Sequence, residues 1–592
     1  MKRQIVTPHK ILLLILVSFV ALASVYSVVV PLFEAPDETA HVDFVRFLRT
    51  ELELPRQGDC GEAHQPPLYY ALAAIASLPA RLDNLDMIWR HNPNFVWAGR
   101  GQDINAVYHT AHEIFPWRDA VLAIHLMRAV SVLMGAITVL VVYLVAREVY
   151  PYHFLVPLTA AALVAFNPQF LFISSVVNND NLANVCAAVV VWMMVRLLVG
   201  HVNWWTLIGL GLSLGIGLTA KQNILALVPA AILVLVYVSI QRHSFRLLLK
   251  GVLTVGGSIV IIAGWWYGRN QILYGDVFGL DAFLAHRPYE NRALITSWEL
   301  GRAFLDKMHR SFWGMFGWMN VPLPTWYYQS LLGLYVLVIV GGGLAWWKNH
   351  RKSQQQWAIW ALLGSLPILY IAWVVMYGYR FGGSGWQGRY LFPTLTAIGL
   401  LLAVGLGHLL SGRGRIAPPL LIISAMLAVA VWALPSVIAP AYSYVTKPLS
   451  ELENVQHPAS ANFGNIIRLA GYDLTVASSA TGPQVVITLY WLVTDQPTQD
   501  YKVFVHLVDP DWVLYGQGDG YPLDGQFPTQ AWRAGDLIID PHTVYFDKPV
   551  PPGRYKIGVG WYLESTGERL PIVQNGQEVG TVAETEQFSL QP

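Results

Sequence analysis

Long apolar segments separated by short polar turns make up most of the first 440 residues of the chain. The first of them, Ile11–Val30, has 20 residues without a charged side chain, which is enough for one helix to cross a bilayer. The pattern therefore predicts a polytopic α-helical membrane protein with about eleven transmembrane helices. The later segments are Ala120–Ala146, Phe154–Val177, Leu182–Val199, Trp204–Ala220, Ile224–Ile240, Leu247–Tyr267, Trp326–Trp347, Trp357–Tyr377, Tyr390–Leu410 and Ile416–Ile438.

From about Phe463 onward the apolar residues instead alternate in short runs, with Gly, Pro and Asp turns between them. Roughly 130 residues with this pattern predict a C-terminal all-β sandwich or jelly roll. The chain therefore divides into a helical membrane region at residues 1–440, a linker at 441–462 and a β domain at 463–592. The predicted strands are Val485–Trp491, Val503–Val508, Leu537–Asp540, Val544–Phe546 and Tyr555–Tyr562.

Two long polar segments, at about residues 32–119 and 268–325, interrupt the membrane region. Basic residues occupy nearly every turn that a cytoplasmic N-terminus would place inside, as the positive-inside rule requires. We therefore expect a cytoplasmic N-terminus, with both long loops and the β domain extracytoplasmic. Lys2, Arg3 and the apolar run after them also fit a cleavable signal peptide, although the run continues well past the possible cleavage site.

The composition agrees with this topology and excludes some functions. Hydrophobic residues make up 54% of the chain and charged residues only 13%. The formal net charge is +1 and no basic run occurs, so we expect no nucleic-acid partner. The two cysteines, Cys60 and Cys186, cannot build a disulfide framework or a cysteine-based zinc site.

An acidic cluster, Glu34, Asp37 and Glu38, directly follows the first apolar segment. An inverting sugar transfer needs one carboxylate that takes the proton from the acceptor hydroxyl. Adjacent acids cannot easily flank a sugar on both faces, which favours Asp37 as the base and Glu38 in an orienting or metal-binding role. A solvated loop, or acidic residues at the positive end of a helix, explains the cluster without chemistry.

His41 would share a helix face with Asp37 if a helix begins near Pro36. The pair could bind a divalent metal together with Glu38, or it could hydrogen-bond a substrate. His109, His112 and Glu113 also have a metal-like spacing, but in the zinc-protease motif the glutamate lies between the two histidines.

Cations near the expected outer surface form a second group of candidates. Arg389, with Arg380 as a weaker companion, could bind a lipid phosphate, although an arginine that reaches toward headgroups is an equal alternative. Arg128 lies inside an apolar segment, where an ionisable residue usually faces a cavity or a partner, and we expect a carboxylate of the first outer loop as that partner. Lys221 and Arg269 could add positive charge for a phosphate, or could simply be interfacial anchors.

Asp180 belongs to a polar turn, Asn178–Asn181, between two apolar segments. The turn could face a carbohydrate or a metal, and helix capping explains it as well. Aromatic residues in the β domain, such as Trp512, Trp532 and Trp561, are either core residues or, where exposed, a surface on which sugars could stack.

Several motifs, taken in order, resemble the bacterial GT-C membrane glycosyltransferases, and more distantly protein O-mannosyltransferases and the aminoarabinose transferase of lipid A. The resemblance covers about residues 1–440. Its motifs are Glu34-Ala-Pro-Asp37-Glu38-x-x-His41, His64-Gln-Pro-Pro-Leu-Tyr-Tyr70, Asn178-Asn-Asp180 and Gln387-Gly-Arg389-Tyr-Leu-Phe-Pro393.

The resemblance implies a multi-pass enzyme of the bacterial plasma membrane that uses a polyprenyl-phosphate-linked sugar on the outer face. It implies Asp37 as catalytic base, with Glu38 beside it, and Arg389 as the residue that binds the lipid phosphate. Metal dependence varies among such enzymes, so a divalent ion stays an open question. The residues predicted to bind substrate are His41, His64, Arg128, Asp180, Lys221, Arg269, Arg380, Gln387 and Arg389.

The sequence thus predicts an integral membrane glycosyltransferase that moves a sugar to an extracytoplasmic glycan, lipid or protein acceptor. A transporter or flippase of lipid-linked sugars is one alternative; it would need polar residues along several spans. A membrane-anchored carbohydrate-binding protein is another, but it leaves the many spans and the acidic loop unexplained.

Overall fold

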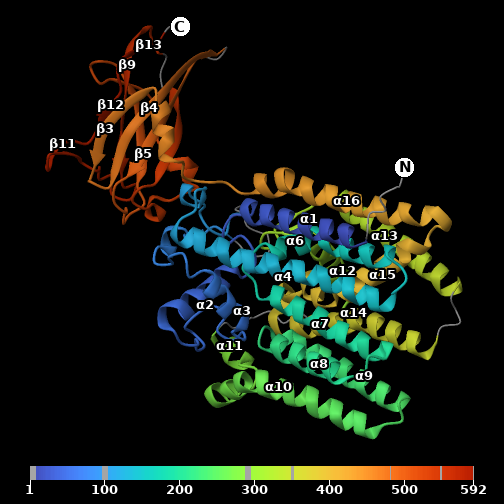
Figure 1. The fold of residues 1–592 in the computed structure, drawn as a ribbon. Coiled ribbons are helices and arrows are strands. Elements are labelled where there is room, and N and C mark those ends of the chain that lie inside the picture. Colours follow the sequence, from blue (N-terminus) through green and yellow to red (C-terminus); the bar gives the residue numbers. More distant parts are fainter. Residues whose placement is uncertain are drawn as a thin grey trace. The chain divides into compact units, whose positions relative to one another are not determined.

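The computed structural model describes residues 8–95, 104–286, 295–348, 353–479, 482–546 and 550–590. The chain divides into two compact units. The first consists of Met1–Asp83, Asn94–Ala106 and Arg118–Tyr442, and the second of Asn84–Pro93, Val107–Trp117 and Ser443–Pro592. Figure 1 shows a helical first unit and a second unit built of strands.

Nine helical segments within the described residues are long and apolar enough to cross a membrane. Figure 1 shows many of these helices side by side, and the predicted polytopic helical membrane protein with a C-terminal β domain is confirmed. The segments are α1 (Pro8–Val29), α4 (Asp119–Val149), α7 (Asp180–Val199), η3 with α9 (Gln222–Ala226, Leu227–Gln241), α10 (Phe245–Tyr274), α13 (Thr325–Lys348), α14 (Gln354–Phe381), η5 with α15 (Gly388–Thr394, Leu395–His408) and α16 with its flanking turns (Gly414–Ala441).

The other two predicted segments also form helices, but each differs from a simple span. Residues 154–177 form a pair, α5 (Leu155–Ala165) and α6 (Pro168–Ser174), bent by 64°. The bend arises where Asn167 caps α6 by accepting hydrogen bonds from the amides of Gln169 and Phe170. Helix α8 (Trp204–Leu218) has 15 residues, so it is short for a full crossing.

Small residues allow the membrane helices to approach closely. Gly341 of α13 lies against Gly405 of α15, where a Cβ on Gly341 would clash with the Gly405 carbonyl oxygen. Close backbone contact of this kind replaces the hydrophobic driving force that is missing inside a bilayer. Any side chain at Gly341 would therefore separate these two helices.

The long polar segments of the first unit contain short elements rather than spans. Helix α2 (Glu38–Glu51) is amphipathic and α3 (Leu68–Ala76) is apolar but only nine residues long. The second segment carries α11 (Leu280–His286), α12 (Trp298–Trp313) and a hairpin of β1 (Met315–Phe316) and β2 (Val321–Pro322).

The second unit is an antiparallel sheet of eleven strands. Its hydrogen-bonded order is β11-β10-β3-β4-β5-β8-β7-β6-β9-β12, with β13 also paired to β9. Trp491, Trp532 and Trp561 are fully buried in its core. The strands are β3 (His457–Phe463), β4 (Ile467–Ser479), β5 (Gly482–Val493), β6 (Lys502–Val508), β7 (Leu514–Gln517), β8 (Leu537–Phe546), β9 (Gly553–Tyr562), β10 (Ile572–Gln574), β11 (Gln577–Gly580), β12 (Ala583–Glu584) and β13 (Phe588–Leu590).

The structure differs from the sequence expectation at two places in this unit. Strand β3 begins at His457, inside the segment expected to be a linker, and the two expected strands at 537–540 and 544–546 form one strand, β8. Two pieces of the first long loop also belong to this unit: Arg90 is paired with Asp536, and Tyr108 packs 5.0 Å from Phe527. Long-range pairs of this kind leave no local pattern in the sequence.

Candidate active site

A buried ion pair between Glu38 and Arg128 fixes the loop that follows α1. Both side chains are 0% exposed, and Arg128 donates from Nε and Nη2 to the two carboxylate oxygens at 2.8 and 2.7 Å. The amides of Phe33 and Val177 also donate to this carboxylate, each at 2.9 Å. The remaining Arg128 donors bind three carbonyls at or just beyond the end of α1: Ser27, Val30 and Pro31. All five guanidinium donors are therefore used inside the protein.

Asp37, the neighbour of Glu38, is placed differently. It precedes α2 in a left-handed conformation with φ 67°, which turns the chain sharply between the two acids. Its side chain is 41% exposed, and its Oδ2 accepts a 2.9 Å hydrogen bond from Arg389 Nη2. Of the two adjacent acids, only Asp37 presents its carboxylate to the surroundings.

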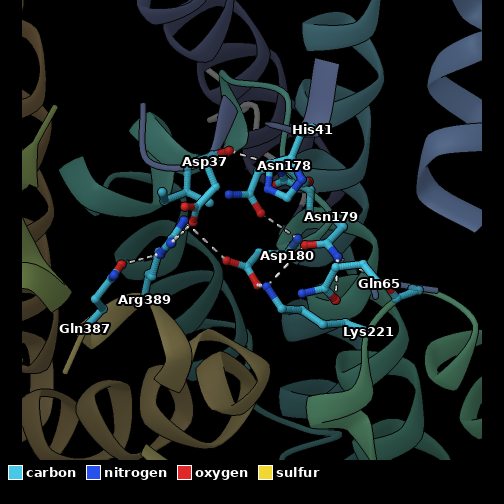
Figure 2. A network of polar contacts seen from close by, with 12 residues as sticks. Asp37, His41, Gln65, Asn178, Asn179, Asp180, Lys221, Gln387 and Arg389 are labelled. Carbon is cyan, nitrogen blue, oxygen red and sulfur yellow. Dashed lines mark hydrogen bonds and ion pairs between the residues drawn. The ribbon is translucent and has the colours of Figure 1, made fainter. Parts of the chain in front are cut away.

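Four charged side chains form a row of alternating sign, Asp37, Arg389, Asp180 and Lys221 (Figure 2). Arg389 Nη1 lies 3.7 Å from Asp180 Oδ2, and Lys221 Nζ donates to Asp180 Oδ1 at 2.5 Å. Arg389 and Asp180 are both buried. Because each of these two buried charges has an opposite neighbour, Arg389 and Asp180 can be held away from water.

Side-chain amides orient the cations of this row. Gln387 Oε1 accepts a 2.6 Å hydrogen bond from Arg389 Nε. Lys221 also donates to Asn179 Oδ1 at 3.1 Å, and Asn179 in turn donates to Gln65 Oε1 at 3.2 Å. The cations therefore have defined directions, which a flexible surface arginine or lysine lacks.

Three buried polar atoms beside the row have no hydrogen-bond partner within the part of the chain that the structure describes: Arg389 Nη1, Asp180 Oδ2 and Asn178 Nδ2. Buried polar groups are almost always hydrogen-bonded. Arg389 Nη1 and Asp180 Oδ2 face each other at 3.7 Å, too far for a hydrogen bond, so each of the three atoms has hydrogen-bonding capacity left for a polar ligand.

His41 lies on the first turn of α2 and faces Tyr70 of α3, with 2.9 Å between His41 Nδ1 and the Tyr70 hydroxyl. Burial disfavours the charged imidazolium and lowers the pKa of His41 to about 3. His41 is therefore neutral at physiological pH and serves as a hydrogen-bonding group beside Asp37.

A cavity of about 470 Å³ borders the row of charges. Gln65, Lys221 and Tyr390 line it, and the Lys221 ammonium lies 5.7 Å from the centre of the Tyr390 ring. Its remaining wall is mostly aromatic and apolar, with one further cation. These residues are His64, Gln222, Asn223, Leu225, Phe278, Leu280, Trp373, Met376, Tyr377, Tyr379 and Arg380.

The structure brings together most of the residues predicted from the sequence. Six of them share the network of Figure 2: Asp37, His41, Asp180, Lys221, Gln387 and Arg389. His64 and Arg380 line the adjacent cavity, where Arg380 is paired with Asp281. Arg269 has another role, because it donates to the carbonyls of Leu54 and Pro55 and so braces the first long loop.

Sequence reasoning missed three contributors: Gln65, Asn179 and Tyr390. Each is the direct neighbour of a predicted residue, His64, Asp180 or Arg389. The quoted motifs contain all three, but the sequence alone does not indicate which member of a motif faces the site.

Within the described residues, no group of three or more His, Cys, Asp or Glu side chains is placed to hold a metal ion. The acids of the network are paired with arginine and lysine. In the second unit, His109 Nδ1 lies 3.0 Å from Glu113 Oε1 and His112 Nε2 lies 3.7 Å from Asp536 Oδ1, so the two histidines of the metal-like spacing face different carboxylates.

Residues 123–267 match the family model described as dolichyl-phosphate-mannose-protein mannosyltransferase. The matched region includes Arg128, Asp180 and Lys221, and excludes Asp37 and Arg389. It lies inside the part of the chain that resembles GT-C glycosyltransferases, and it confirms that resemblance, while the individual motifs stay predictions. Among curated proteins, no sequence matches the chain significantly.

Three solved structures match this chain over part of its length. ArnT from Cupriavidus metallidurans bound to undecaprenyl phosphate is 13% identical, with a TM-score of 0.40, over 72% of this chain and 73% of that chain. An Archaeoglobus fulgidus oligosaccharyltransferase in complex with Zn and sulfate is 13% identical, with a TM-score of 0.42, over 74% and 54%. The S. cerevisiae Pmt1-Pmt2 complex bound to the sugar donor is 18% identical, with a TM-score of 0.33, over 46% and 35%.

Proposed function

We propose that this protein is a membrane glycosyltransferase that transfers a sugar from a polyprenyl-phosphate donor to an extracytoplasmic acceptor with inversion at the sugar. The observation that carries the proposal is the row Asp37, Arg389, Asp180 and Lys221 at the edge of an aromatic cavity between membrane helices. The match of residues 123–267 to a family named for a lipid-phosphate sugar donor supports the donor class.

The cations of the row suit the donor phosphate. Arg389 Nη1 makes no hydrogen bond among the described residues, although it lies 3.7 Å from Asp180 Oδ2, and the planar guanidinium matches phosphate geometry. Lys221 adds a second positive charge on the cavity wall. The polyprenyl chain would lie against apolar cavity residues such as Trp373 and Met376, since a lipid tail favours a concave apolar surface.

Asp37 suits the base. In the transfer, the acceptor oxygen forms a bond with the anomeric carbon and the bond from that carbon to the phosphate oxygen breaks. Asp37 takes the proton of the acceptor hydroxyl, and the polyprenyl phosphate leaves with its negative charge held by Arg389 and Lys221. Glu38 does not suit the role of base, because Arg128 and two backbone amides already donate hydrogen bonds to both of its carboxylate oxygens.

The transfer can be tested with purified protein in lipid nanodiscs and a panel of radiolabelled polyprenyl-phosphate monosaccharides. We expect the wild type to release sugar from one donor, and Asp37→Asn to lose about 10²- to 10⁴-fold in rate, as for removal of a general base. Asp43→Asn is the matched control, because Asp43 lies on the same helix in a local ion pair with Arg46 away from the row.

Asp37→Asn turning over donor at the wild-type rate would contradict the assignment of the base. If the wild type binds a labelled donor and releases no sugar with any acceptor offered, the proposed enzyme is wrong and a transporter of lipid-linked sugars is favoured.

A further inference from the structure

Trp512 occupies a position in the second unit where a glycine would be expected. It lies in the loop between β6 and β7, whose turn is closed by the Trp512 amide donating to the Asp509 carbonyl at 3.0 Å and the Asp509 amide donating to the Val513 carbonyl at 3.2 Å. The Asp509 side chain adds a 2.9 Å hydrogen bond from the Val513 amide. The backbone of Trp512 has φ 63°, the left-handed conformation that hairpin loops of this kind usually give to glycine.

Neither the backbone nor the core explains a tryptophan at this position. A bulky residue is disfavoured in the left-handed region relative to glycine, and 44% of Trp512 is exposed. A strained conformation that the surrounding structure imposes on a large side chain indicates a functional position.

The indole packs against two residues of strand β9. The ammonium of Lys556 lies 4.4 Å from the centre of the ring, although Lys556 itself is only 8% exposed. The ring also rests on Gly558, where a Cβ would come within 3.2 Å of Cη2 and Cζ3 of Trp512. The absent side chain at Gly558 and the buried lysine together let the ring pack against β9, while 44% of Trp512 stays exposed.

Hydrogen-bonding groups border this ring. Lys556 Nζ donates to Glu584 Oε2 at 2.8 Å, and the Glu584 side chain is 45% exposed. A flat, rigid aromatic face beside a half-exposed carboxylate is complementary to a sugar ring, whose C–H face is apolar and whose rim carries hydroxyl groups.

We infer that Trp512, Lys556 and Glu584 form a saccharide-binding site on the β unit, with the sugar stacked on the exposed part of the indole and a sugar hydroxyl donating to Glu584. This site is separate from the residues proposed for transfer, and it requires no turnover. Binding in the absence of a polyprenyl-phosphate donor therefore tests it independently of the proposed function.

The experiment is calorimetric titration of the full chain in nanodiscs, free of sugar-based detergents, with neutral gluco-, manno-, galacto- and N-acetylglucosamine oligosaccharides. We expect one of these classes to bind the wild type. Trp512→Gly should weaken that binding by about tenfold or more, as for truncation of a central aromatic contact, without lowering the unfolding temperature, since glycine suits the turn.

Glu584→Gln should weaken binding without disturbing the turn, while Trp512→Phe keeps part of it. Tyr545→Ala, which removes a 72% exposed aromatic residue on β8, is the control and should leave binding unchanged. If no oligosaccharide of the panel binds the wild type, or if Trp512→Gly binds as the wild type does, the proposed site is wrong.

Discussion

Arg389 donates a 2.9 Å hydrogen bond to Asp37 across 352 sequence positions. The proposed base and the proposed phosphate-binding residue therefore neutralise each other in this structure. A donor phosphate that binds Arg389 would compete for this guanidinium and leave the Asp37 carboxylate more available to an acceptor hydroxyl. On our proposal, donor binding precedes the use of Asp37 as a base.

Arg389→Lys should reduce sugar transfer although it keeps the positive charge. A single ammonium cannot reach Gln387, Asp37 and a phosphate with the fork geometry of a guanidinium. We expect the KM for the donor to rise by about tenfold or more, measured in the transfer assay over a range of donor concentrations. Arg310→Lys is the control, because Arg310 forms a partly exposed ion pair with Asp306 on α12, and it should behave as the wild type. If Arg389→Lys shows the same KM for the donor as Arg310→Lys, the assignment of Arg389 as the phosphate-binding residue is wrong.

Lys221→Met should weaken donor binding and lower stability together. The change removes the cation 2.5 Å from Asp180 and leaves this buried carboxylate with Arg389 as its one remaining close cation among the described residues. Loss of one partner of a buried charge pair costs about 2–5 kcal/mol. Binding of labelled polyprenyl phosphate and thermal unfolding should both change, whereas Lys250→Met, at a lysine stacked on Trp204, should change neither.

Glu38→Gln should destabilise the fold more than Asp37→Asn does. It leaves the Arg128 guanidinium, which is 0% exposed, without its countercharge, and a broken buried pair costs about 3–5 kcal/mol. Replacing both partners, Glu38→Gln with Arg128→Met, should cost less than the sum of the two single changes. Denaturant unfolding of the four proteins measures this coupling, and strictly additive losses would show that the two residues do not act as a pair.

His41 should make the protein less stable as the pH falls from about 6.5, its ordinary pKa, towards 3. Burial lowers the pKa of His41 to about 3, so in this window the unfolded chain binds a proton that the folded chain does not. Stability then rises with pH and is lost on acidification. His41→Gln should flatten this part of a plot of unfolding temperature against pH, and an unchanged slope would contradict a buried neutral imidazole.

Four charged side chains near His41 also change its pKa. Asp37 and Asp180 raise its pKa, and Lys221 and Arg389 lower it further. Asp37→Asn should therefore lower the pKa of His41 further and extend the pH range of the stability loss to lower pH. Lys221→Met should have the opposite effect and raise the pKa of His41.

Much of the fold was predictable because its causes are local. Apolar segments of sufficient length form helices in a membrane, and each of the expected segments is helical in the structure. The roles of Asp37 and Glu38 were not predictable in the same way. The two acids are adjacent, but their difference depends on Arg128 and on the Val177 amide, which lie 90 and 139 positions from Glu38.

Contacts between residues far apart in the sequence also explain the other features of the site and of the β unit that the sequence did not predict. Gln65 and Asn179 become part of the network only when their segments meet, and Arg90 joins the β unit through Asp536, 446 positions away. A sequence pattern identifies side chains that can do chemistry, while burial and partners follow from contacts between distant segments.

The chain passes between the two units five times, at residues 83–84, 93–94, 106–107, 117–118 and 442–443. A single cut in the chain therefore cannot release the complete β unit as one fragment. A stop codon after Tyr442 would remove most of that unit but leave two of its segments, Asn84–Pro93 and Val107–Trp117, in the first long loop of the membrane unit. Any duplication, loss or exchange of this β unit by recombination would thus have to alter three places in the gene together. The two units are expected to be inherited as one.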